Sequence, residues 1–305
     1  MSKYAPSKGE LAPRDLISRS EITEIEEGRG VQEPSGLDYI YLDLRHLGAK
    51  KINERLPLIR EVCMEFNDID PVKEPIPCRP VAHYSMGGIE TNIKGSTRVK
   101  GIWAAGEAAC VSLHGANRLG SNSTAECLVW GKITGAEAGS YCREVQKPVP
   151  APEDKVSAEH KRLFEDLMSG SGKENLYDIR RELRSCMDVN VGVYRTGQEL
   201  TRALEKIQSL RKRYANIGID DKNSIYNTNL YHALETANLL DLAEVMVTGA
   251  LTRTESRGGH ARRDYPVRDD ANWLKHTLAF CTEQGPKLDY KPVTITTWQP
   301  VERKY

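Results

Sequence analysis

The side chains best suited to chemistry fall in one stretch of the sequence. It contains His83-Tyr-Ser-Met-Gly-Gly, then Gly106-Glu107, then His-Gly-Ala-Asn-Arg118-Leu-Gly-Ser-Asn-Ser123. The imidazole and the guanidinium stand among Gly, Ala and Ser residues, so a flat ligand could lie directly on the backbone. Arg118 offers a planar fork of donors that suits one carboxylate, and His83 can hold another. The stretch therefore predicts a site where a small dicarboxylate meets a flat ring such as a flavin.

A helix is expected to begin at Ser123, because Ser123 and Glu126 form the S-x-x-E pattern of a capping box. The unpaired amides and the positive dipole end of that helix would attract an anion. A reduced flavin carries negative charge near N1 and the C2 carbonyl, and the small side chains of Gly120–Ser123 would let that edge reach the amides. An ordinary capped helix has the same local sequence, so both interpretations fit.

Three other polar residues have an ordinary structural interpretation, and Glu107 has a functional one as well. Glu107 follows a predicted strand, Val99–Ala105, and could accept hydrogen bonds from ribityl or ribose hydroxyls, or simply be solvated. His114 is interpreted as a residue that shapes its loop. Arg14 stands beside Asp15 and would ordinarily form half of a surface ion pair.

Composition excludes several classes of protein. Lys and Arg together number 43, as do Asp and Glu, so no basic excess points to nucleic acid. No apolar run approaches the roughly 20 residues of a membrane span, and the N-terminus lacks the apolar core of a secretory signal. The seven cysteines contain no C-x-x-C pair, which suits a reducing cytosol and argues against a zinc or iron–sulfur site in this chain. We expect a cytoplasmic protein without a metal, linked to a membrane only through partners.

The first part of the chain reads as mixed helix and strand. Tyr39–Leu44 alternates like a strand, and Pro57–Phe66 reads as a helix with proline in its first turn. The expected apolar face of this helix consists of Ile59, Val62, Cys63 and Phe66. The helix at Ser123 has Gly131, Gly135 and Gly139 on one face, which would let it lie close against a neighbouring backbone.

The second part reads as helical after a stiff, proline-rich linker at Lys147–Pro152. Thr196 and Glu199 form a second capping box, and a long apolar stripe starts near Asn227. These patterns predict a three-helix bundle. After Asp264 the chain reads as irregular and charged, with one strand at Lys291–Thr297.

Together these segments resemble the flavoprotein subunit of succinate dehydrogenase and fumarate reductase along nearly the whole chain. The matching motifs are Leu11–Asp15, Glu27–Gly30, His83–Ile89, Gly106-Glu107, His114–Ser123, Glu255–Arg262, Arg268–His276 and Lys291–Thr294. The resemblance implies an FAD-dependent oxidoreductase of the α/β plus α class. It also implies a capping-domain tail at 1–75, the C-terminal part of a Rossmann-like FAD-binding domain at 76–147, a helical bundle at 153–262 and a small C-terminal region at 263–305.

The resemblance assigns roles residue by residue. His83 and Arg118 match ligands of the substrate dicarboxylate, and Arg14 matches the arginine that exchanges a proton with it. The implied flavin contacts are Glu107, Ser123 and Thr124, and the residues implied to line the same site are Tyr84, Gly106, Ser121 and Asn122. Such a subunit interconverts succinate and fumarate by hydride transfer at flavin N5. It exchanges electrons with an iron–sulfur subunit that leads to a membrane anchor and quinone, at the cytoplasmic face of the inner membrane.

The chain departs from this family because it lacks the motif that binds the pyrophosphate of the cofactor. No G-x-G-x-x-G motif stands between a predicted strand and a predicted helix. The segment most similar to that motif, Ser169–Gly172, follows a predicted helix. We therefore expect the C-terminal half of such a subunit. Its missing N-terminal half would supply the pyrophosphate site and part of the substrate site, so this chain alone should bind FAD weakly and turn over slowly.

Other functions stay open at this point. L-aspartate oxidase shares the His-Tyr and His-Gly-Ala-Asn-Arg segments, although Arg268–His276 and Lys291–Thr294 favour succinate dehydrogenase and fumarate reductase. A thiol-linked fumarate reductase and a non-catalytic remnant that docks onto a partner subunit are the further alternatives. The charged stretch Glu255–His276 fits either a contact surface for the iron–sulfur subunit or an internal salt-bridge network.

Overall fold

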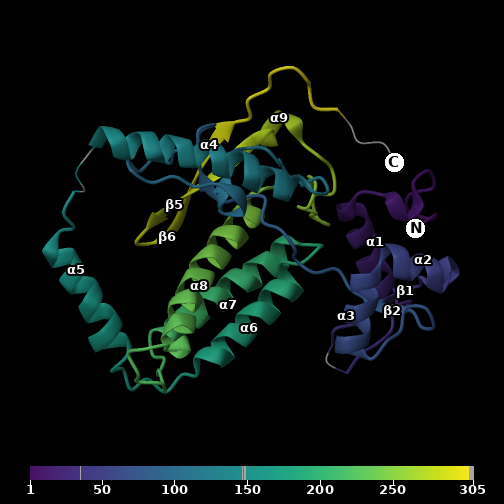
Figure 1. Cartoon of the computed structure of the whole chain (residues 1–305), viewed down its shortest axis with the longest axis horizontal. Helices are drawn as coiled ribbons and strands as arrows, with labels where there is room; N and C mark the ends of the chain where they lie inside the picture. The colour runs from purple at the N-terminus through teal and green to yellow at the C-terminus, as the bar shows by residue number, and fades with distance from the viewer. Residues whose placement is uncertain (35, 146, 148, 302–305) are drawn as a thin grey trace. The chain divides into compact units, whose positions relative to one another are not determined.

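The computed structural model describes all residues except 35, 146, 148 and 302–305. The chain forms two compact units, residues 1–83 and residues 84–300, which Figure 1 shows in purple to blue and in blue to yellow. Within the described residues, no helix is long and apolar enough to cross a membrane. No group of three or more His, Cys, Asp or Glu side chains in the same residues could hold a metal ion.

The first unit combines short helices with a two-stranded sheet. Its helices are α1 (Arg14–Glu26), α2 (Gly48–Arg55) and α3 (Pro57–Asn67), and β1 (Ile40–Leu42) pairs antiparallel with β2 (Ile76–Cys78). The predicted strand and the helix that opens at Pro57 are confirmed. The expected apolar face of α3 is largely uncovered within this unit, because Cys63 is buried but Phe66 is 79% exposed.

Residues 84–145 consist of loops and one long helix. The strands β3 (Ile89–Glu90) and β4 (Ala109–Cys110) form a minimal parallel pair, and α4 (Asn122–Val145) begins one residue before the predicted start. The strand predicted at Val99–Ala105 is wrong. The segment turns back on itself and contributes a single bridge, from Trp103 to Ser96. The backbone hydrogen bonds beside that bridge, from the Thr97 N–H to the Ile102 carbonyl and from the Ala104 N–H to the Gly95 carbonyl, are too few to form a strand.

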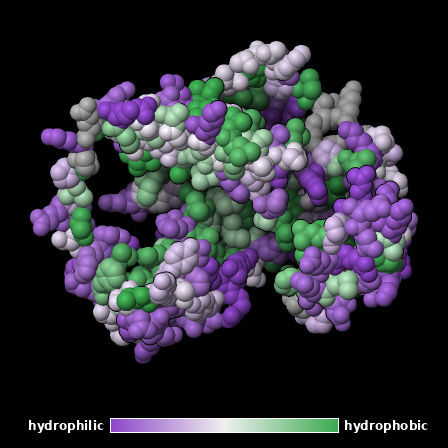
Figure 2. Space-filling view, viewed as in Figure 1, coloured by the Kyte–Doolittle hydropathy of each residue, from purple (hydrophilic) through white to green (hydrophobic). Residues whose placement is uncertain are grey.

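The surface over α4 is rich in apolar side chains, which Figure 2 shows as green atoms among purple, hydrophilic ones. Leu128 is 71% exposed and Val129 is 49% exposed. No described atom lies within 4 Å of a Cβ built on Gly131 or Gly135, so the face of small residues is not packed against another backbone here.

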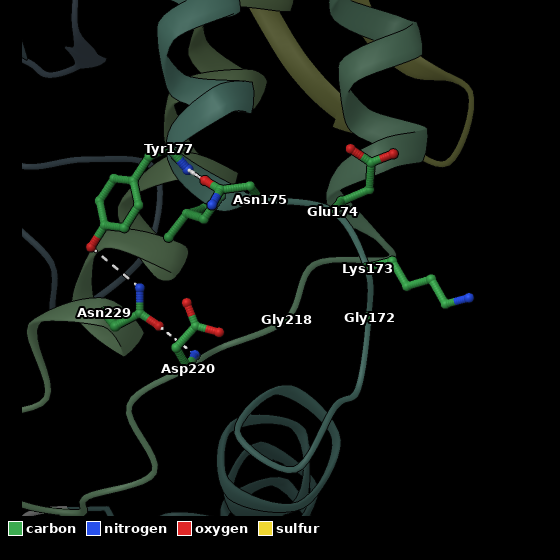
Figure 3. Close-up of a pocket in the computed structure, with 9 residues that line it drawn as sticks. Gly172, Lys173, Glu174, Asn175, Tyr177, Gly218, Asp220 and Asn229 are labelled. Atoms are coloured by element: carbon green, nitrogen blue, oxygen red, sulfur yellow. Dashed lines mark hydrogen bonds between the residues drawn. The ribbon is translucent and has the colours of Figure 1, made fainter.

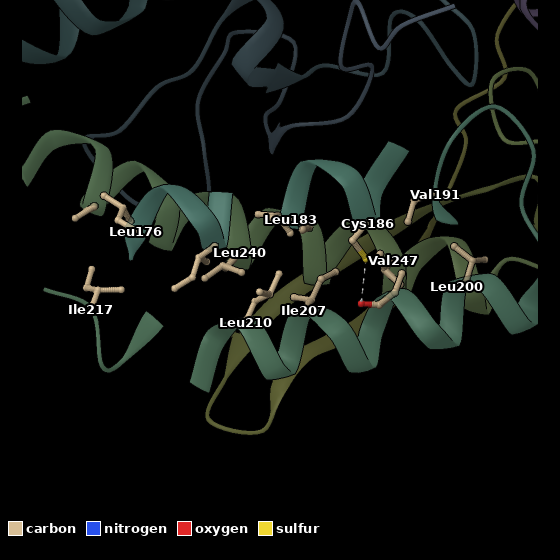
Figure 4. Close-up of a cluster of buried hydrophobic side chains, with 14 of the residues drawn as sticks. Leu176, Leu183, Cys186, Val191, Leu200, Ile207, Leu210, Ile217, Leu240 and Val247 are labelled. Carbon is tan, nitrogen blue, oxygen red and sulfur yellow. Dashed lines mark hydrogen bonds between the residues drawn. The ribbon is translucent and has the colours of Figure 1, made fainter. Parts of the chain in front are cut away.

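Three helices form the bundle that the sequence predicts. After α5 (Glu153–His160), which continues as a π-helix over Lys161–Leu167, come α6 (Leu176–Asn190), α7 (Gly197–Tyr214) and α8 (Thr228–Thr252). Their apolar stripes meet in one core, drawn in Figure 4, whose fully buried members include Ile179, Leu200, Ile207, Leu210 and Val247. The linker predicted at Lys147–Pro152 lies partly outside the described residues.

Side-chain caps start all three bundle helices, and at the start of α6 Asn175 Oδ1 accepts the Tyr177 N–H at 2.8 Å. Thr196 Oγ1 accepts the Glu199 N–H at 3.2 Å, and Asn227 Oδ1 accepts the Leu230 N–H at 2.7 Å. The cap at Thr196 is as predicted, and the Thr196 hydroxyl also donates to Glu199 Oε2 at 2.8 Å.

The chain beyond the bundle is more regular than its composition indicates. After the short helix α9 (Asp270–Trp273), β5 (Lys275–Thr282) and β6 (Gly285–Pro292) form an antiparallel hairpin. The strand predicted at Lys291–Thr297 is therefore misplaced, because β6 ends at Pro292. The hairpin contacts the segment before α4, since His276 Nε2 lies 2.9 Å from Ser112 Oγ and Lys291 pairs with Glu90 at 3.0 Å.

Candidate active site

A buried carboxylate, that of Glu126, organises the start of α4. Its side chain is 3% exposed, and its Oε2 accepts a hydrogen bond from Tyr84 Oη at 2.6 Å and lies 2.7 Å from His114 Nε2. Burial and the hydrogen bond to Glu126 raise the pKa of Tyr84 above its usual range, so the phenol stays protonated and donates. The capping box predicted for Ser123 and Glu126 is therefore wrong, because the carboxylate is engaged by two loops instead.

Arg118 lies beside this group with part of its guanidinium unsatisfied. Its central carbon is 4.7 Å from the centroid of the Tyr84 ring, and Nη1 donates to the Leu119 carbonyl at 3.2 Å. The Arg118 N–H donates to Met86 Sδ at 3.1 Å. Among the described residues, the buried Nε has no hydrogen-bond partner. An unpaired buried donor costs roughly 1–3 kcal/mol, so this guanidinium is suited to an anion that supplies the missing acceptor.

Gly106 and Glu107 occupy a 3-10 turn, Gly106–Ala108, and do not follow a strand. The φ of Gly106 is +71°, and a Cβ there would lie 3.0 Å from Cys127 Sγ on α4. Glu107 is exposed, and its Oε1 accepts the Ser85 N–H at 2.8 Å. The turn is thus tied both to α4 and to the segment that carries Tyr84.

The entry into α4 combines small side chains with a strained backbone. Ser121 has a φ of +66°, which costs a residue other than glycine on the order of 1 kcal/mol. Asn122, Ser123 and Thr124 then form the first turn of the helix. Amides in the first turn of a helix have no acceptor within it, so this end can receive an anionic or electron-rich ligand atom.

A segment after the bundle, which we call the 253–262 strap, supports the loop that carries Arg118. The Gly259 N–H donates to the Ala116 carbonyl at 2.8 Å. Gly258 has a φ of +58°, and a Cβ there would lie 2.2 Å from the same carbonyl oxygen, so only glycine fits. His260 Nδ1 accepts from Arg195 at 3.1 Å, which anchors the strap to the start of α7.

His260 is neutral in this position. Its burial, and then the charge of Arg195, lower its pKa to about 4. Nδ1 therefore accepts from Arg195, while Nε2 donates to the Arg253 carbonyl at 3.1 Å. The imidazole joins the strap to the bundle as an uncharged hydrogen-bonding group.

The charged stretch forms an internal network. Glu255 has no exposed side-chain surface, and it pairs with Arg253 at 2.6 Å and Arg257 at 2.8 Å. Although burial alone would raise the pKa of Glu255, hydrogen bonds from Arg257, from the Asp269 N–H and from Arg253 lower it overall. For Glu255, Arg253 and Arg257, these contacts favour the internal network.

Arg14 and His83 belong to the first unit, whereas Tyr84, Arg118 and the flavin-contact candidates belong to the second. Both Arg14 and His83 are exposed. The carboxylate of Asp15 pairs with Arg19 at 3.0 Å, so it is not reserved for its neighbour Arg14. The structure thus joins Tyr84, Arg118 and the start of α4 by direct contacts, and Glu107 is connected to them through the Ser85 N–H.

A small polar cavity of about 110 Å³ lies elsewhere, at the start of α6 (Figure 3). Part of its polar lining is hydrogen-bonded internally, since Asn229 donates to Tyr177 Oη at 3.2 Å and accepts the Asp220 N–H at 3.0 Å. Gly172, the last residue of the Ser-Gly-Ser-Gly segment, lines this cavity. A Cβ at Gly172 would lie 2.2 Å from the Asn216 carbonyl oxygen. Gly172 therefore allows two backbone segments to pack closely.

Sequence reasoning missed two members of the site. Glu126 was assigned a local cap and His114 a loop-shaping role, yet both side chains are at least 95% buried. A usable signal was present for Glu126, because it is the one charged residue between Asn122 and Gly131, among small and apolar neighbours. An acid in such a setting is buried only with partners.

Two family models match the chain. The model described as an FAD binding domain matches residues 2–124, and the model described as the C-terminal part of fumarate reductase flavoproteins matches residues 180–305. The first match is to an FAD binding domain and agrees with the predicted cofactor. The second narrows the similarity to fumarate reductase flavoproteins.

Named relatives agree. The fumarate reductase flavoprotein subunit of Mycobacterium tuberculosis is 46% identical over 302 residues, which cover 97% of this chain and 52% of the relative. The succinate dehydrogenase flavoprotein subunit of Rickettsia bellii is 42% identical over 308 residues, or 97% of this chain and 51% of the relative. A solved chain of the Escherichia coli quinol fumarate reductase superposes with a TM-score of 0.91 at 43% identity, over 96% of this chain and 50% of that one. The predicted resemblance is confirmed, and the chain spans about half the length of the curated relatives it matches.

Proposed function

We propose that this chain is the part of a succinate dehydrogenase or fumarate reductase flavoprotein that binds the substrate and the flavin ring. The observation that carries the proposal is the Arg118 guanidinium, whose buried Nε has no acceptor among the described residues, at the start of α4. A carboxylate of succinate or fumarate supplies that acceptor. The finer fold assignment is part of the proposal: a capping-domain tail and the C-terminal part of a Rossmann-like domain, followed by the bundle.

The residues divide the work as follows. Arg118 binds one carboxylate and His83 the other, and this double hold fixes the two central carbons, which can contribute several kcal/mol to the rate enhancement. Arg14 exchanges a proton with one of these carbons. Gly106, Glu107 and Ser121–Thr124 hold FAD, which supplies a two-electron acceptor or donor when bound. The positive end of α4 stabilises negative charge on the ring.

The chain requires partners for this role. The residues that grip the pyrophosphate come from a complementary flavoprotein segment, and an iron–sulfur subunit relays electrons between the flavin and quinone at a membrane anchor. In this arrangement the flavoprotein is peripheral to the cytoplasmic face of the membrane.

The test uses the assembled protein. We would tag the chain at its chromosomal locus, purify what assembles with it and measure succinate-dependent dye reduction and fumarate-dependent oxidation of reduced viologen. Both activities are expected, and Arg118→Lys should raise KM for both substrates at least tenfold. Arg98→Lys, on an exposed arginine paired with Glu90, is the matched control. An FAD-loaded assembly that oxidises L-aspartate or a thiol donor instead, or that lacks activity, overturns the proposal.

A further inference from the structure

Glu126 has no part in the proposed chemistry, yet it is the most buried carboxylate at the site. We propose that Glu126 is a positioning residue, which holds the Arg118 guanidinium in its carboxylate-binding orientation through Tyr84 and His114. The inference rests on the proposed role of Arg118 as a substrate ligand and adds a residue that touches neither substrate nor flavin.

The contacts show how one carboxylate could act on Arg118 at a distance. The same oxygen, Oε2, is shared by Tyr84 Oη and His114 Nε2, which lie 42 and 12 residues away in the sequence. Tyr84 belongs to the segment whose Met86 sulfur accepts the Arg118 N–H, and His114 starts the loop that ends in Arg118. Glu126 thereby fastens both supports of the guanidinium to one point on α4.

The Tyr84 ring is the direct link. The hydrogen bond from the phenol oxygen to Glu126 fixes the far end of the Tyr84 ring and therefore its plane. The ring also makes an edge-to-face contact with His114, at 5.3 Å between centroids, which fixes the position of that imidazole. The Arg118 guanidinium lies over that ring. A cation is stabilised by an aromatic face only while that face is turned toward it. Release of Tyr84 from Glu126 thus frees Arg118 as well.

The buried charge also explains why a carboxylate, and not an apolar side chain, occupies the position. A carboxylate that is 3% exposed must be hydrogen-bonded, so it imposes a fixed arrangement on its donors. An apolar residue would fill the space without specifying where Tyr84 and His114 lie. Glu126→Gln keeps the volume but weakens both hydrogen bonds, which makes it the informative substitution.

The experiment compares Glu126→Gln with Tyr84→Phe, Arg118→Lys and the double variant Glu126→Gln/Arg118→Lys in the purified assembly. The matched control is Glu144→Gln, on an exposed acid of the same helix. Glu126→Gln and Tyr84→Phe should each raise KM for succinate and fumarate about tenfold and lower kcat less than threefold. Glu126→Gln should add nothing in the Arg118→Lys background, because its effect passes through Arg118.

A second readout does not depend on turnover. In NMR spectra of the ¹⁵N-labelled chain, the Arg118 Nε–Hε signal carries the ring-current shift of Tyr84, and Glu126→Gln should move it toward the position of a free arginine. An unchanged signal with an unchanged KM overturns the positioning role. So does a loss of activity that is additive with Arg118→Lys, since that indicates general destabilisation. If Arg118→Lys itself leaves KM unchanged, the proposed function fails first, which separates the two failures.

Discussion

The helical bundle and residues 84–145 belong to the same compact unit but are stabilised in opposite ways. The bundle buries a continuous apolar core built from α6, α7 and α8. Between residues 84 and 145, all of which are described, Ala109 is the one buried apolar side chain, whereas Leu119 and Leu128 are 67% and 71% exposed. Exposed apolar surface on this scale is typical of a face that another polypeptide covers. The bundle therefore has an apolar core of its own, whereas the segment with the candidate site lacks one.

Unsatisfied buried polar groups distinguish the two regions in the same way. Among the described residues, the buried side-chain donors and acceptors without a hydrogen-bond partner all lie in this segment: Thr91, Trp103, Arg118, Trp130 and Thr134. The bundle has none of them. Unsatisfied buried groups are rare in complete interiors and gather where a ligand or a partner is to supply the missing bond. Function and incomplete packing therefore coincide here.

The largest expected effect tests the bundle core. Ile207→Ala removes a fully buried side chain and should lower the free energy of unfolding by about 3 kcal/mol. Leu128→Ala, on exposed α4 surface, should change it by about 0.5 kcal/mol or less. Urea unfolding followed by circular dichroism measures both, and equal losses would mean that α4 is covered in solution.

The next effect concerns the strap. Gly258→Ala places a Cβ 2.2 Å from the Ala116 carbonyl oxygen at a positive φ, so it should destabilise by about 2 kcal/mol or more. Gly131→Ala, inside α4 with open space around it, should stabilise by about 0.5–1 kcal/mol. Thermal unfolding of the two variants gives opposite shifts if the strap supports the site loop.

A smaller effect depends on pH. The unfolded chain takes up a proton on His260 near pH 6.5, whereas the folded chain does so near pH 4, so this imidazole costs stability as the pH falls through that window. His260→Gln should remove on the order of 1–2 kcal/mol of this pH dependence. Unfolding titrations from pH 7 to pH 4.5 measure it, with His46→Gln on an exposed histidine as control. A slope that His260→Gln leaves intact contradicts a neutral His260.

The smallest effect comes from the surface attachment of the hairpin. Lys291 pairs with Glu90 at 3.0 Å, and both side chains are partly exposed. Lys291→Met should cost about 0.5 kcal/mol in dilute buffer and less in 1 M salt. A loss of several kcal/mol would show that the hairpin is a main support of the site segment.

Periodicity was sufficient to predict the bundle. Leu200, Ile207 and Leu210 recur at helical spacing and are buried, and the caps at Thr196 and Asn227 mark where two helices begin. Pro57 also predicted the start of α3 correctly, because the fixed φ and missing N–H of proline favour the first turn of a helix. Local rules succeed where the partners of a residue are near in sequence.

The predictions failed where residues that are distant in the sequence determine the local structure. The apolar run at Val99–Ala105 favours a strand, but a strand needs a neighbour, and the chain provides a single bridge at Ser96. Glu126 fits a capping box locally, while its observed partners come from two separate loops. The contact of Arg118 with Tyr84 could not be predicted, because nothing in the spacing of the two residues indicates that the guanidinium lies over the ring.

The strap has a consequence for how the molecule responds to heat. Ala116 is held by Gly259, and His260 is held by Arg195 at the start of α7, so melting of the bundle withdraws the support of the loop that ends in Arg118. Loss of helicity and loss of anion binding should then occur at one temperature. By the same coupling, an anion captured at Arg118 makes the distant helices more resistant to melting.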